Sequence, residues 1–263
     1  MAMTKTEGEL DDRGGAVAGI IFDLDGTLLR GHQPMPGAIS LLHALERPYV
    51  IASNNSSDTA AGLAASLRRV GLCVCPDRLI LAGEIALEEV ACRFDGADVM
   101  LIAAAPLHDR ARAIGIRTVT QGGDVVLVCR DERFDYAALA AAANSLQRGA
   151  HLMAANPDRS HPGHAGAAIP ETGSLLAAVM AASGRTEAEI IGKPQPLMLR
   201  RALARLGVEA GEALLVGDNQ DTDGAGAQRL GIAFHQVDGS RRAPLGALDV
   251  LKSLPSGHAR AAE

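Results

Sequence analysis

The sequence predicts an α/β fold, with a Rossmann-like parallel sheet as its core and a second α/β segment inserted into that core. Three observations support this prediction: short apolar runs alternate with helix-length segments, polar clusters follow several of these runs, and the pattern changes near Ile80. Strands that alternate with helices form parallel sheets covered by helices. Ligands bind such sheets at the carboxyl ends of the strands, so the polar clusters are candidate functional residues.

The composition excludes several classes of protein. The 263 residues carry a formal net charge of −6 and are 48% apolar, which is typical of a globular chain without electrostatic attraction to nucleic acid or anionic membranes. No apolar run reaches the roughly 18 residues of a membrane span, and Met1–Gly15 lacks the apolar segment of a signal peptide. We interpret the four cysteines as reduced thiols. We therefore expect a cytoplasmic protein without a nucleic-acid or membrane partner.

The first apolar run, over residues 16–22, ends in two acids, Asp23 and Asp25, which Gly26 and Thr27 follow. Alternate residues of a strand share a face, so both side chains can point the same way. Paired carboxylates repel each other and resist burial, and a divalent cation is the simplest way to offset that cost. A polar turn that only closes the strand explains the same residues equally well.

The next segments repeat this arrangement. A helix is predicted over Ala38–Glu46 and a strand over Tyr49–Ala52, and the polar cluster Ser53-Asn54-Asn55-Ser56-Ser57 follows that strand. Thr59–Val70 is predicted to be an amphipathic helix. Two polar clusters thus follow two predicted strands of one sheet.

From Ile80 onward the strand candidates are separated by Gly-rich turns, and none of them ends in a comparable cluster. Helices are predicted over 84–94 and 136–146, and strands over 99–103, 117–119, 125–129 and 152–155. We expect an α/β cap domain over 80–156, inserted into a discontinuous core domain of 16–79 and 157–240. We expect residues 1–15 to be a disordered lead-in and residues 241–263 to be a C-terminal tail.

The stretch over 156–170 is rich in Pro, Gly and His, and it is predicted to be a loop. His151, His161 and His164 are a candidate metal site, but their spacing matches no common zinc pattern. A solvated loop is the favoured interpretation. A helix is predicted over Thr172–Ser183, with a glycine after it as the stop signal.

Lys193 is the only lysine between Lys5 and Lys252, among 25 basic residues. Arg and Lys are not interchangeable where a compact ammonium group is needed. We therefore favour a chemical role for Lys193 over a place in a surface turn.

A third polar cluster follows a predicted strand over Ala213–Val216, with Asp218, Asp221 and Asp223 close together. Such a cluster again needs a cation to offset the repulsion between its charges. The neighbouring predictions are helices over 197–206 and 224–230 and a last strand over 232–237.

In a doubly wound sheet these strand ends converge in one crevice. The acids suggest Mg²⁺, which is typically held by one or two carboxylates, waters and substrate phosphate. The lysine and the Ser/Asn cluster supply donors for phosphate oxygens. The chemistry that fits is phosphoryl transfer, in which a carboxylate can attack phosphorus.

Four motifs resemble those of the haloacid dehalogenase (HAD) superfamily in order and in separation. They are Asp23–Leu28, Ser53–Ser56, Gly192–Pro194 and Gly217–Asp223, and the resemblance covers about residues 16–237. The chain is most similar to the NagD-like branch, which includes 4-nitrophenyl phosphatases, pyridoxal phosphate phosphatases and phosphoglycolate phosphatases. That closer match rests on Pro36-Gly37-Ala38, on 154–158, on 173–175 and on Lys193-Pro194 with Pro196 and Met198.

The resemblance implies a HAD core with an inserted α/β cap, and a Mg²⁺-dependent phosphatase that works through an aspartyl-phosphate. It implies that Asp23 is the nucleophile and binds the metal. Asp25 would be the general acid and base, and its backbone carbonyl would also bind the metal. Asp218 would bind Mg²⁺, and Asp223 would orient metal-bound waters or the lysine. Asp221 is left out of the expected site.

The same resemblance implies a phosphate-binding group. Ser53 and the backbone amides of Asn54 and Asn55 would hold the phosphoryl oxygens, and Lys193 would neutralise developing charge and hold the nucleophile in place. In the cap, the segment around Arg133 resembles the specificity loop of the family. Arg133 is therefore a candidate for contacting the leaving group, although a solvated surface arginine is an equally good interpretation.

Two departures from the family pattern concern the substrate. Cys129-Arg130 stands where the family often has a glycine and a smaller or apolar residue, and Glu171 stands where small residues are common. Both are expected near the junction of the cap or its entrance. The expected partner is a small-molecule phosphate ester. Members of this branch often pair through their caps, so a homodimer and a monomer both stay open.

Three other classes of protein share part of this pattern. A dehalogenase of the same superfamily lacks the second acid that Asp25 provides here. A response-regulator domain also uses strand-end acids, a hydroxyl and a lysine, but without the Asp-x-Asp-Gly-Thr order and without a long insert. The alternative that remains is a non-hydrolytic phosphate-binding or inactive HAD-like protein, although no catalytic position of the motifs is substituted.

Overall fold

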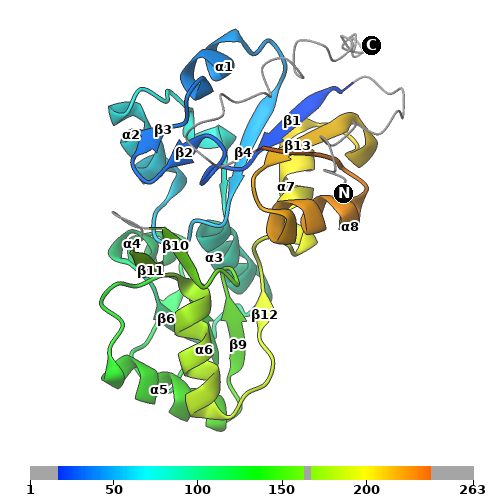
Figure 1. Cartoon of the computed structure of the whole chain (residues 1–263). Helices are drawn as coiled ribbons and strands as arrows, with labels where there is room; N and C mark the ends of the chain where they lie inside the picture. Colours follow the sequence, from blue (N-terminus) through cyan, green and yellow to red (C-terminus); the bar gives the residue numbers. More distant parts are fainter. Residues whose placement is uncertain (1–16, 163–166, 238–263) are drawn as a thin grey trace, which may run out of the picture. The chain divides into compact units, whose positions relative to one another are not determined.

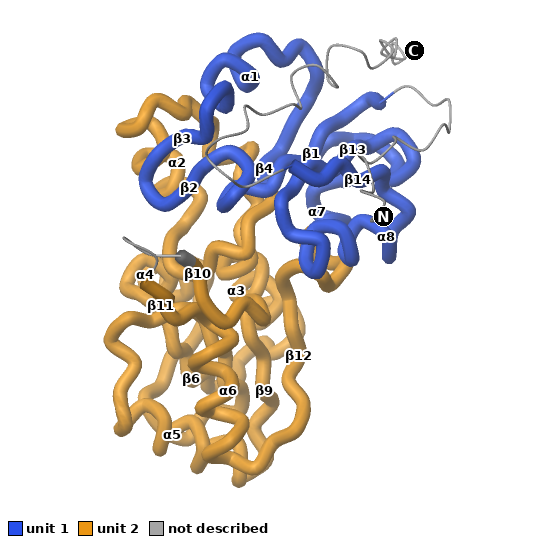
Figure 2. Tube along the Cα trace, viewed as in Figure 1, with its two compact units in different colours: residues 1–51, 199–263 blue, residues 52–198 orange. Residues whose placement is uncertain are grey.

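The computed structural model describes residues 17–162 and 167–237 of the chain. Figure 1 shows its helices and strands, and Figure 2 shows the two compact units into which the chain divides. Unit 1 comprises Met1–Ile51 and Leu199–Glu263, and unit 2 comprises Ala52–Met198. The predicted lead-in over 1–15 and the predicted tail over 241–263 lie outside the described residues. The bounds predicted for the cap, 80–156, stay a prediction.

Unit 1 is built on a parallel sheet, as the sequence predicts. Its strands β1 (Gly19–Phe22), β4 (Tyr49–Ser53), β13 (Ala213–Gly217) and β14 (Ala233–Gln236) lie in the order β14-β13-β1-β4. Every residue of β1 and β13 is buried, and in the parallel register Phe22 lies opposite both Val216 and Ile51. Strands that are buried on both faces require such continuous apolar runs.

The remaining elements of unit 1 connect and cover these strands. They are β2 (Leu29–Arg30), β3 (Gln33–Pro34), α1 (Ala38–Ala44), α7 (Pro196–Leu206), the 3₁₀ turn Ala210–Glu212, the π-helical turn Gln220–Gly224 and α8 (Ala225–Leu230). The predicted helices over 38–46, 197–206 and 224–230 are confirmed to within a few residues. The antiparallel pair β2-β3 was not predicted, because two-residue strands leave no periodicity to detect.

Unit 2 contains a second parallel sheet. Its strands are β6 (Asp98–Ile102), β7 (Arg117–Thr118), β8 (Val125–Val128), β9 (His151–Ala154) and β12 (Glu189–Ile190), in the order β12-β9-β8-β6-β7. One face of this sheet packs against α5 (Tyr136–Gln147) and α6 (Thr172–Ser183) around Val126, Leu152 and Val179. Figure 1 shows both helices beside the sheet.

The other elements of unit 2 are α2 (Ala60–Arg69), the 3₁₀ turn Pro76–Arg78, β5 (Leu79–Leu81), α3 (Ala82–Arg93) and α4 (Ala105–Ala113). Thr59 caps α2 by accepting a hydrogen bond from the N–H of Gly62, and Gly184 ends α6 with φ 73°. Helix α4 was missed by the sequence analysis. Its proline at the start and its charged second half obscure the apolar stripe of Leu107 and Ala111.

The stretch over 156–170 differs from its prediction. It was expected to be a loop, but β10 (Ser160–Pro162) pairs in antiparallel register with β11 (Ala168–Pro170). Pro and Gly normally indicate turns, and strands this short do not outweigh that signal in the sequence. None of the described helices has the length and hydropathy that crossing a membrane requires.

Candidate active site

Three carboxylates gather at the carboxyl ends of the strands in unit 1. Asp23 directly follows β1 and Asp218 directly follows β13, while Asp223 lies in the π-helical turn after β13. One carboxylate oxygen from each lies within 4.8 Å of the others. Asp23 and Asp223 are buried, with 7% and 1% of their surface exposed. The structure thus brings together three of the predicted acids.

Two glycines let these carboxylates approach the backbone. Gly26 has φ 91°, and a Cβ atom on it would lie 2.0 Å from Oδ2 of Asp218. A Cβ atom on Gly217 would lie 2.4 Å from Oδ2 of Asp223. Because real Cβ contacts are never this short, any larger residue at either position would displace a carboxylate. The glycines of the first and fourth motifs therefore fix where the acids can lie.

The three carboxylates fit a hard divalent cation. Carboxylates so close together repel one another, and oxygen-rich acidic sites of this kind suit Mg²⁺ or Ca²⁺. Asp23, Asp218 and Asp223 could each supply a ligand atom. Asp223 was expected to act without touching the ion, and its carboxylate lies close enough to bind the ion directly.

Two other acids of the motifs lie outside this group. Asp25 and Asp221 are exposed, and the N–H of Asp221 donates to Oδ1 of Asn219 at 2.9 Å. Thr27, two residues after Asp25, is fully buried, and its hydroxyl has no hydrogen-bond partner among the described residues. The role predicted for Asp25 in proton transfer stays a prediction.

The phosphate-binding residues predicted from the sequence lie in unit 2. Ser53 is 1% exposed, and its Oγ accepts a hydrogen bond from the N–H of Asn55 at 3.1 Å. The side-chain oxygen of Asn55 accepts from the N–H groups of Ser57 and Asp58, both at 3.1 Å. These local bonds hold the turn after β4 in one conformation.

Asn54 connects that turn to Lys193. The N–H of Lys193 donates to Oδ1 of Asn54 at 2.8 Å, and Nδ2 of Asn54 donates to the carbonyl of Lys193 at 3.1 Å. A Cβ atom on Gly192 would lie 2.5 Å from Oδ1 of Asn54, so the glycine of the third motif is needed for this contact. Lys193 is itself 2% exposed. The structure therefore brings together the second and third motifs, as the sequence predicts.

Asn156 is a residue of this network that the sequence analysis missed. Its Nδ2 lies 2.6 Å from the carbonyl oxygen of Asn54, 3.2 Å from Oγ of Ser56 and 3.3 Å from Oγ1 of Thr172. It is 1% exposed. An amide two residues after the strand β9 was the available signal, because strand ends of a parallel sheet carry ligand-binding residues.

Arg133 does not contact this network in the described structure. Its side chain is 76% exposed, and its nearest ion-pair contact is Asp131 at 3.9 Å. The histidines considered as metal ligands do not come together either: His161 bonds Glu171 at 2.7 Å, His151 bonds Glu189 at 2.9 Å, and His164 lies outside the described residues.

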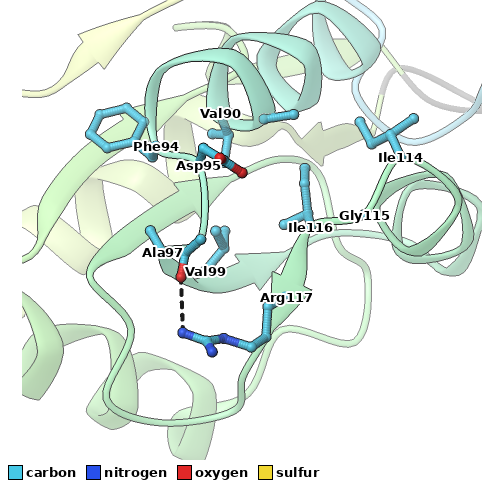
Figure 3. Close-up of a pocket in the computed structure, with 11 residues that line it drawn as sticks. Val90, Phe94, Asp95, Ala97, Val99, Ile114, Gly115, Ile116 and Arg117 are labelled. Carbon is cyan, nitrogen blue, oxygen red and sulfur yellow. Dashed lines mark hydrogen bonds between the residues drawn. The ribbon is translucent and has the colours of Figure 1, made fainter.

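A cavity of about 130 Å³ in unit 2 holds none of the predicted site residues. Figure 3 shows its lining, which includes the apolar side chains of Phe94, Val99 and Ile116 and the charged side chains of Asp95 and Arg117. Nη2 of Arg117 donates to the carbonyl of Gly96 at 2.9 Å.

Comparison with known proteins places this chain in a family. A family model of haloacid dehalogenase-like hydrolases matches residues 17–231. A D-glycerol 3-phosphate phosphatase of Mycobacterium tuberculosis is 32% identical over 217 residues, which are 81% of this chain and 60% of that protein. An acid sugar phosphatase of Staphylococcus epidermidis is 28% identical over 81% of this chain and 83% of its own length.

Solved structures give the same result. A glycerol phosphate phosphatase of M. tuberculosis in complex with magnesium has a TM-score of 0.79 at 30% identity, over 86% of this chain and 68% of its own. A 4-nitrophenylphosphatase of Thermotoga maritima has a TM-score of 0.79 at 29% identity, over 85% and 87%. NagD of Escherichia coli has a TM-score of 0.77 at 26% identity, over 92% and 94%. The chain therefore belongs to the haloacid dehalogenase-like hydrolases, in their NagD-like branch.

Proposed function

We propose that this protein is a Mg²⁺-dependent phosphatase that hydrolyses a small phosphorylated metabolite through an aspartyl-phosphate on Asp23. The observation that carries the proposal is the group of three carboxylates at the strand ends, Asp23, Asp218 and Asp223, within 4.8 Å of one another. Such a group suits a divalent cation beside a carboxylate nucleophile. Phosphatases among the relatives support the reaction class, and the magnesium complex of one of them supports the metal.

The acids would divide the chemistry between them. A carboxylate oxygen of Asp23 attacks phosphorus, the bond to the leaving oxygen breaks, and protonated Asp25 gives its proton to that oxygen. Asp25 then takes a proton from water, which attacks the aspartyl-phosphate at phosphorus and restores the carboxylate of Asp23. Asp25 is exposed, which is compatible with proton exchange with solvent.

The metal would be held by Asp23, by Asp218, and by either the carboxylate of Asp223 or the backbone carbonyl of Asp25. Bound there, Mg²⁺ would supply charge neutralisation for the phosphoryl oxygens. Ser53 and the backbone amides of Asn54 and Asn55 would hold these oxygens, and Lys193 would neutralise the developing charge. The bonds between Asn54 and Lys193 fix two of these groups relative to each other.

The substrate would be a small phosphate ester, and the segment inserted between the second and third motifs would select it. Arg133 stays a candidate for contact with the leaving group. A homodimer and a monomer both stay open, and light scattering on purified protein distinguishes them.

Hydrolysis of 4-nitrophenyl phosphate tests the proposed function. We expect turnover that requires Mg²⁺, stops with EDTA and returns when Mg²⁺ is added in excess. Asp23→Asn removes the nucleophile with little change in volume, so activity should be lost while the circular dichroism spectrum is kept. Turnover by Asp23→Asn equal to that of the wild type would contradict the mechanism. Binding of phosphate without any turnover would favour the alternative, a phosphate-binding protein that does not hydrolyse esters.

A further inference from the structure

The two departures from the family pattern noted in the sequence, Arg130 and Glu171, contact each other. Nη1 of Arg130 lies 3.5 Å from Oε1 of Glu171, and the same oxygen is bonded to Nδ1 of His161 at 2.7 Å. Nη2 of Arg130 donates to Glu132 at 2.7 Å. All four residues belong to unit 2. We call Arg130 and Glu171 the Arg–Glu pair.

Arg130 follows a strand of the same sheet as Lys193, one of the predicted phosphate-binding residues. Ile190, Ala154 and Val128 lie side by side in the parallel register of β12, β9 and β8. Lys193 follows the first of these strands closely and Arg130 follows the third. Neighbouring strands are about 4.8 Å apart, so the ends of β12 and β8, with β9 between them, are separated by about 10 Å.

Hydrogen bonds connect the pair to the phosphate-binding turn. The N–H of Arg130 donates to Oγ of Ser56 at 3.2 Å, and Nδ2 of Asn156 donates to the same Oγ and to the carbonyl of Asn54. On the other side, Nδ2 of Asn54 donates to Asp158 at 3.0 Å, whose charge acts on Glu171. Hydrogen bonds through Ser56 and Asn156 therefore connect the backbone of Arg130 to the turn that carries the predicted phosphate-binding residues.

Both members of the Arg–Glu pair have side-chain atoms without a hydrogen-bond partner among the described residues. The guanidinium group of Arg130 has five N–H donors. Among the described residues, only its bond to Glu132 meets hydrogen-bond geometry, and its buried Nε has no partner. The side chain of Glu132 is 78% exposed, so this bond is easily exchanged. Oε2 of Glu171 accepts no hydrogen bond within the part of the chain that is described. The guanidinium group of Arg130 thus has N–H groups left to donate, and it lies beside Glu171, whose Oε2 can still accept a hydrogen bond.

This combination matches a hydroxyl group better than a carboxylate. A hydroxyl both donates and accepts, so it can bond Glu171 and Arg130 together. A carboxylate accepts only, so it could bond Arg130 but not the carboxylate of Glu171, whose charge it would face. Burial raises the pKa of Glu171, and Arg130 and His161 oppose that rise, so its carboxyl group is already costly to ionise. A second anion beside it would add to this cost.

We propose that Arg130 and Glu171 determine specificity, and that they select phosphate esters of small uncharged polyols and reject phosphate esters that carry a carboxylate. This inference rests on the proposed phosphatase function, which it makes more specific. Arg130 and Glu171 are assigned to substrate binding, and they take no part in bond breaking.

The test compares glycerol phosphate with phosphoglycolate, with 4-nitrophenyl phosphate as the reference substrate. We expect wild-type kcat/KM to be at least tenfold higher for glycerol phosphate than for phosphoglycolate. In Glu171→Gln that ratio should fall at least tenfold, partly through a gain in activity on phosphoglycolate, because the repelling charge is removed. A gain cannot come from misfolding. Arg130→Lys keeps the charge but loses the planar fork, so KM for glycerol phosphate should rise severalfold.

Glu189 provides a matched control. It too bonds an arginine and a histidine of unit 2, Arg93 and His151, and Glu189→Gln removes the same charge. We expect Glu189→Gln to leave the substrate ratio within twofold of the wild type. The proposal is overturned if Glu171→Gln leaves the ratio unchanged, if Glu189→Gln shifts it equally, or if Arg133→Gln alone shifts it. A wild-type enzyme active only on 4-nitrophenyl phosphate also overturns it, whereas a protein inactive on all three esters contradicts the proposed function itself.

Discussion

Replacing Gly26 by alanine tests two properties of this glycine: its left-handed backbone conformation, and the space that it leaves for the carboxylate of Asp218. A side chain at φ 91° is strained, which costs about 1–2 kcal/mol in the left-handed region. The added Cβ would also lie 2.0 Å from Oδ2 of Asp218, so that carboxylate must move. Adding about 1–2 kcal/mol for this displacement, which is typical of overpacking, we expect Gly26→Ala to lower the free energy of unfolding by about 2–4 kcal/mol.

Gly31→Ala is the matched control in the same unit. Gly31 has φ 60°, and a Cβ atom there would meet nothing within 4 Å. It shares the backbone strain without the clash, so about 1 kcal/mol should be lost. Urea unfolding of both variants measures the two costs, and their difference isolates the contact with Asp218.

The same pair of variants tests whether Asp218 binds the metal. Moving a ligand out of place typically lowers metal affinity about 10–100-fold. The Mg²⁺ concentration for half-maximal hydrolysis of 4-nitrophenyl phosphate should therefore rise by that factor in Gly26→Ala and stay unchanged in Gly31→Ala. Equal Mg²⁺ dependence of the two variants would refute the reasoning that links Gly26 to the position of Asp218.

Three further predictions follow from individual contacts. Asn156→Ala removes a buried amide that bonds Asn54, so it should lower the free energy of unfolding by about 1–3 kcal/mol. It should also raise KM for 4-nitrophenyl phosphate. An unchanged KM would contradict the link between Asn156 and the phosphate-binding turn. Burial raises the pKa of Cys129 to about 12, so iodoacetamide at pH 8 should label the three exposed cysteines and spare Cys129, as peptide mass spectrometry can show. The hydrogen bond from Arg93 lowers the pKa of Glu189. The stability that this bond adds, under about 1 kcal/mol for so exposed a pair, is present above the ordinary carboxyl pKa and is lost as the pH falls. Urea unfolding should therefore distinguish Glu189→Gln from the wild type at pH 7 and not at pH 3.

Much of the fold could be predicted because the apolar runs expected to form strands alternate clearly with the segments expected to form helices. The apolar runs that became β1, β4, β8 and β13 are buried on both faces, and that environment requires the residues found there. The elements that were missed are short: β10 and β11 span three residues each, and tertiary pairing decides their conformation more than local preference does.

The residues of the candidate site could be predicted where they belong to a short motif of neighbouring residues. Asp23, Ser53, Lys193 and Asp218 each stand at a strand end beside residues with turn chemistry. Asn156 was missed because a single buried amide after a strand has no characteristic spacing. Its significance comes from three acceptors, on Asn54, Ser56 and Thr172, that are distant in the sequence.

The Arg–Glu pair illustrates the same limit. Arg130 and Glu171 are 41 positions apart, and in the sequence each stands out only as a departure from a family pattern. Their contact depends on how β8 and the start of α6 pack within unit 2, which no local pattern encodes. A pairing between distant residues has to be observed in the fold.

Trapping the aspartyl-phosphate is the most direct test of the proposed reaction. Asp25→Asn removes the base that activates water, while 4-nitrophenolate leaves without needing an acid, so the phosphorylated enzyme should accumulate. After a rapid quench, borohydride reduces an acyl phosphate to an alcohol. We predict that peptide mass spectrometry will find homoserine at position 23, only when substrate and Mg²⁺ were both present. An unmodified Asp23 in a variant that has released a stoichiometric burst of 4-nitrophenolate, or a reduced residue at any other position, would contradict the assignment of Asp23 as the nucleophile.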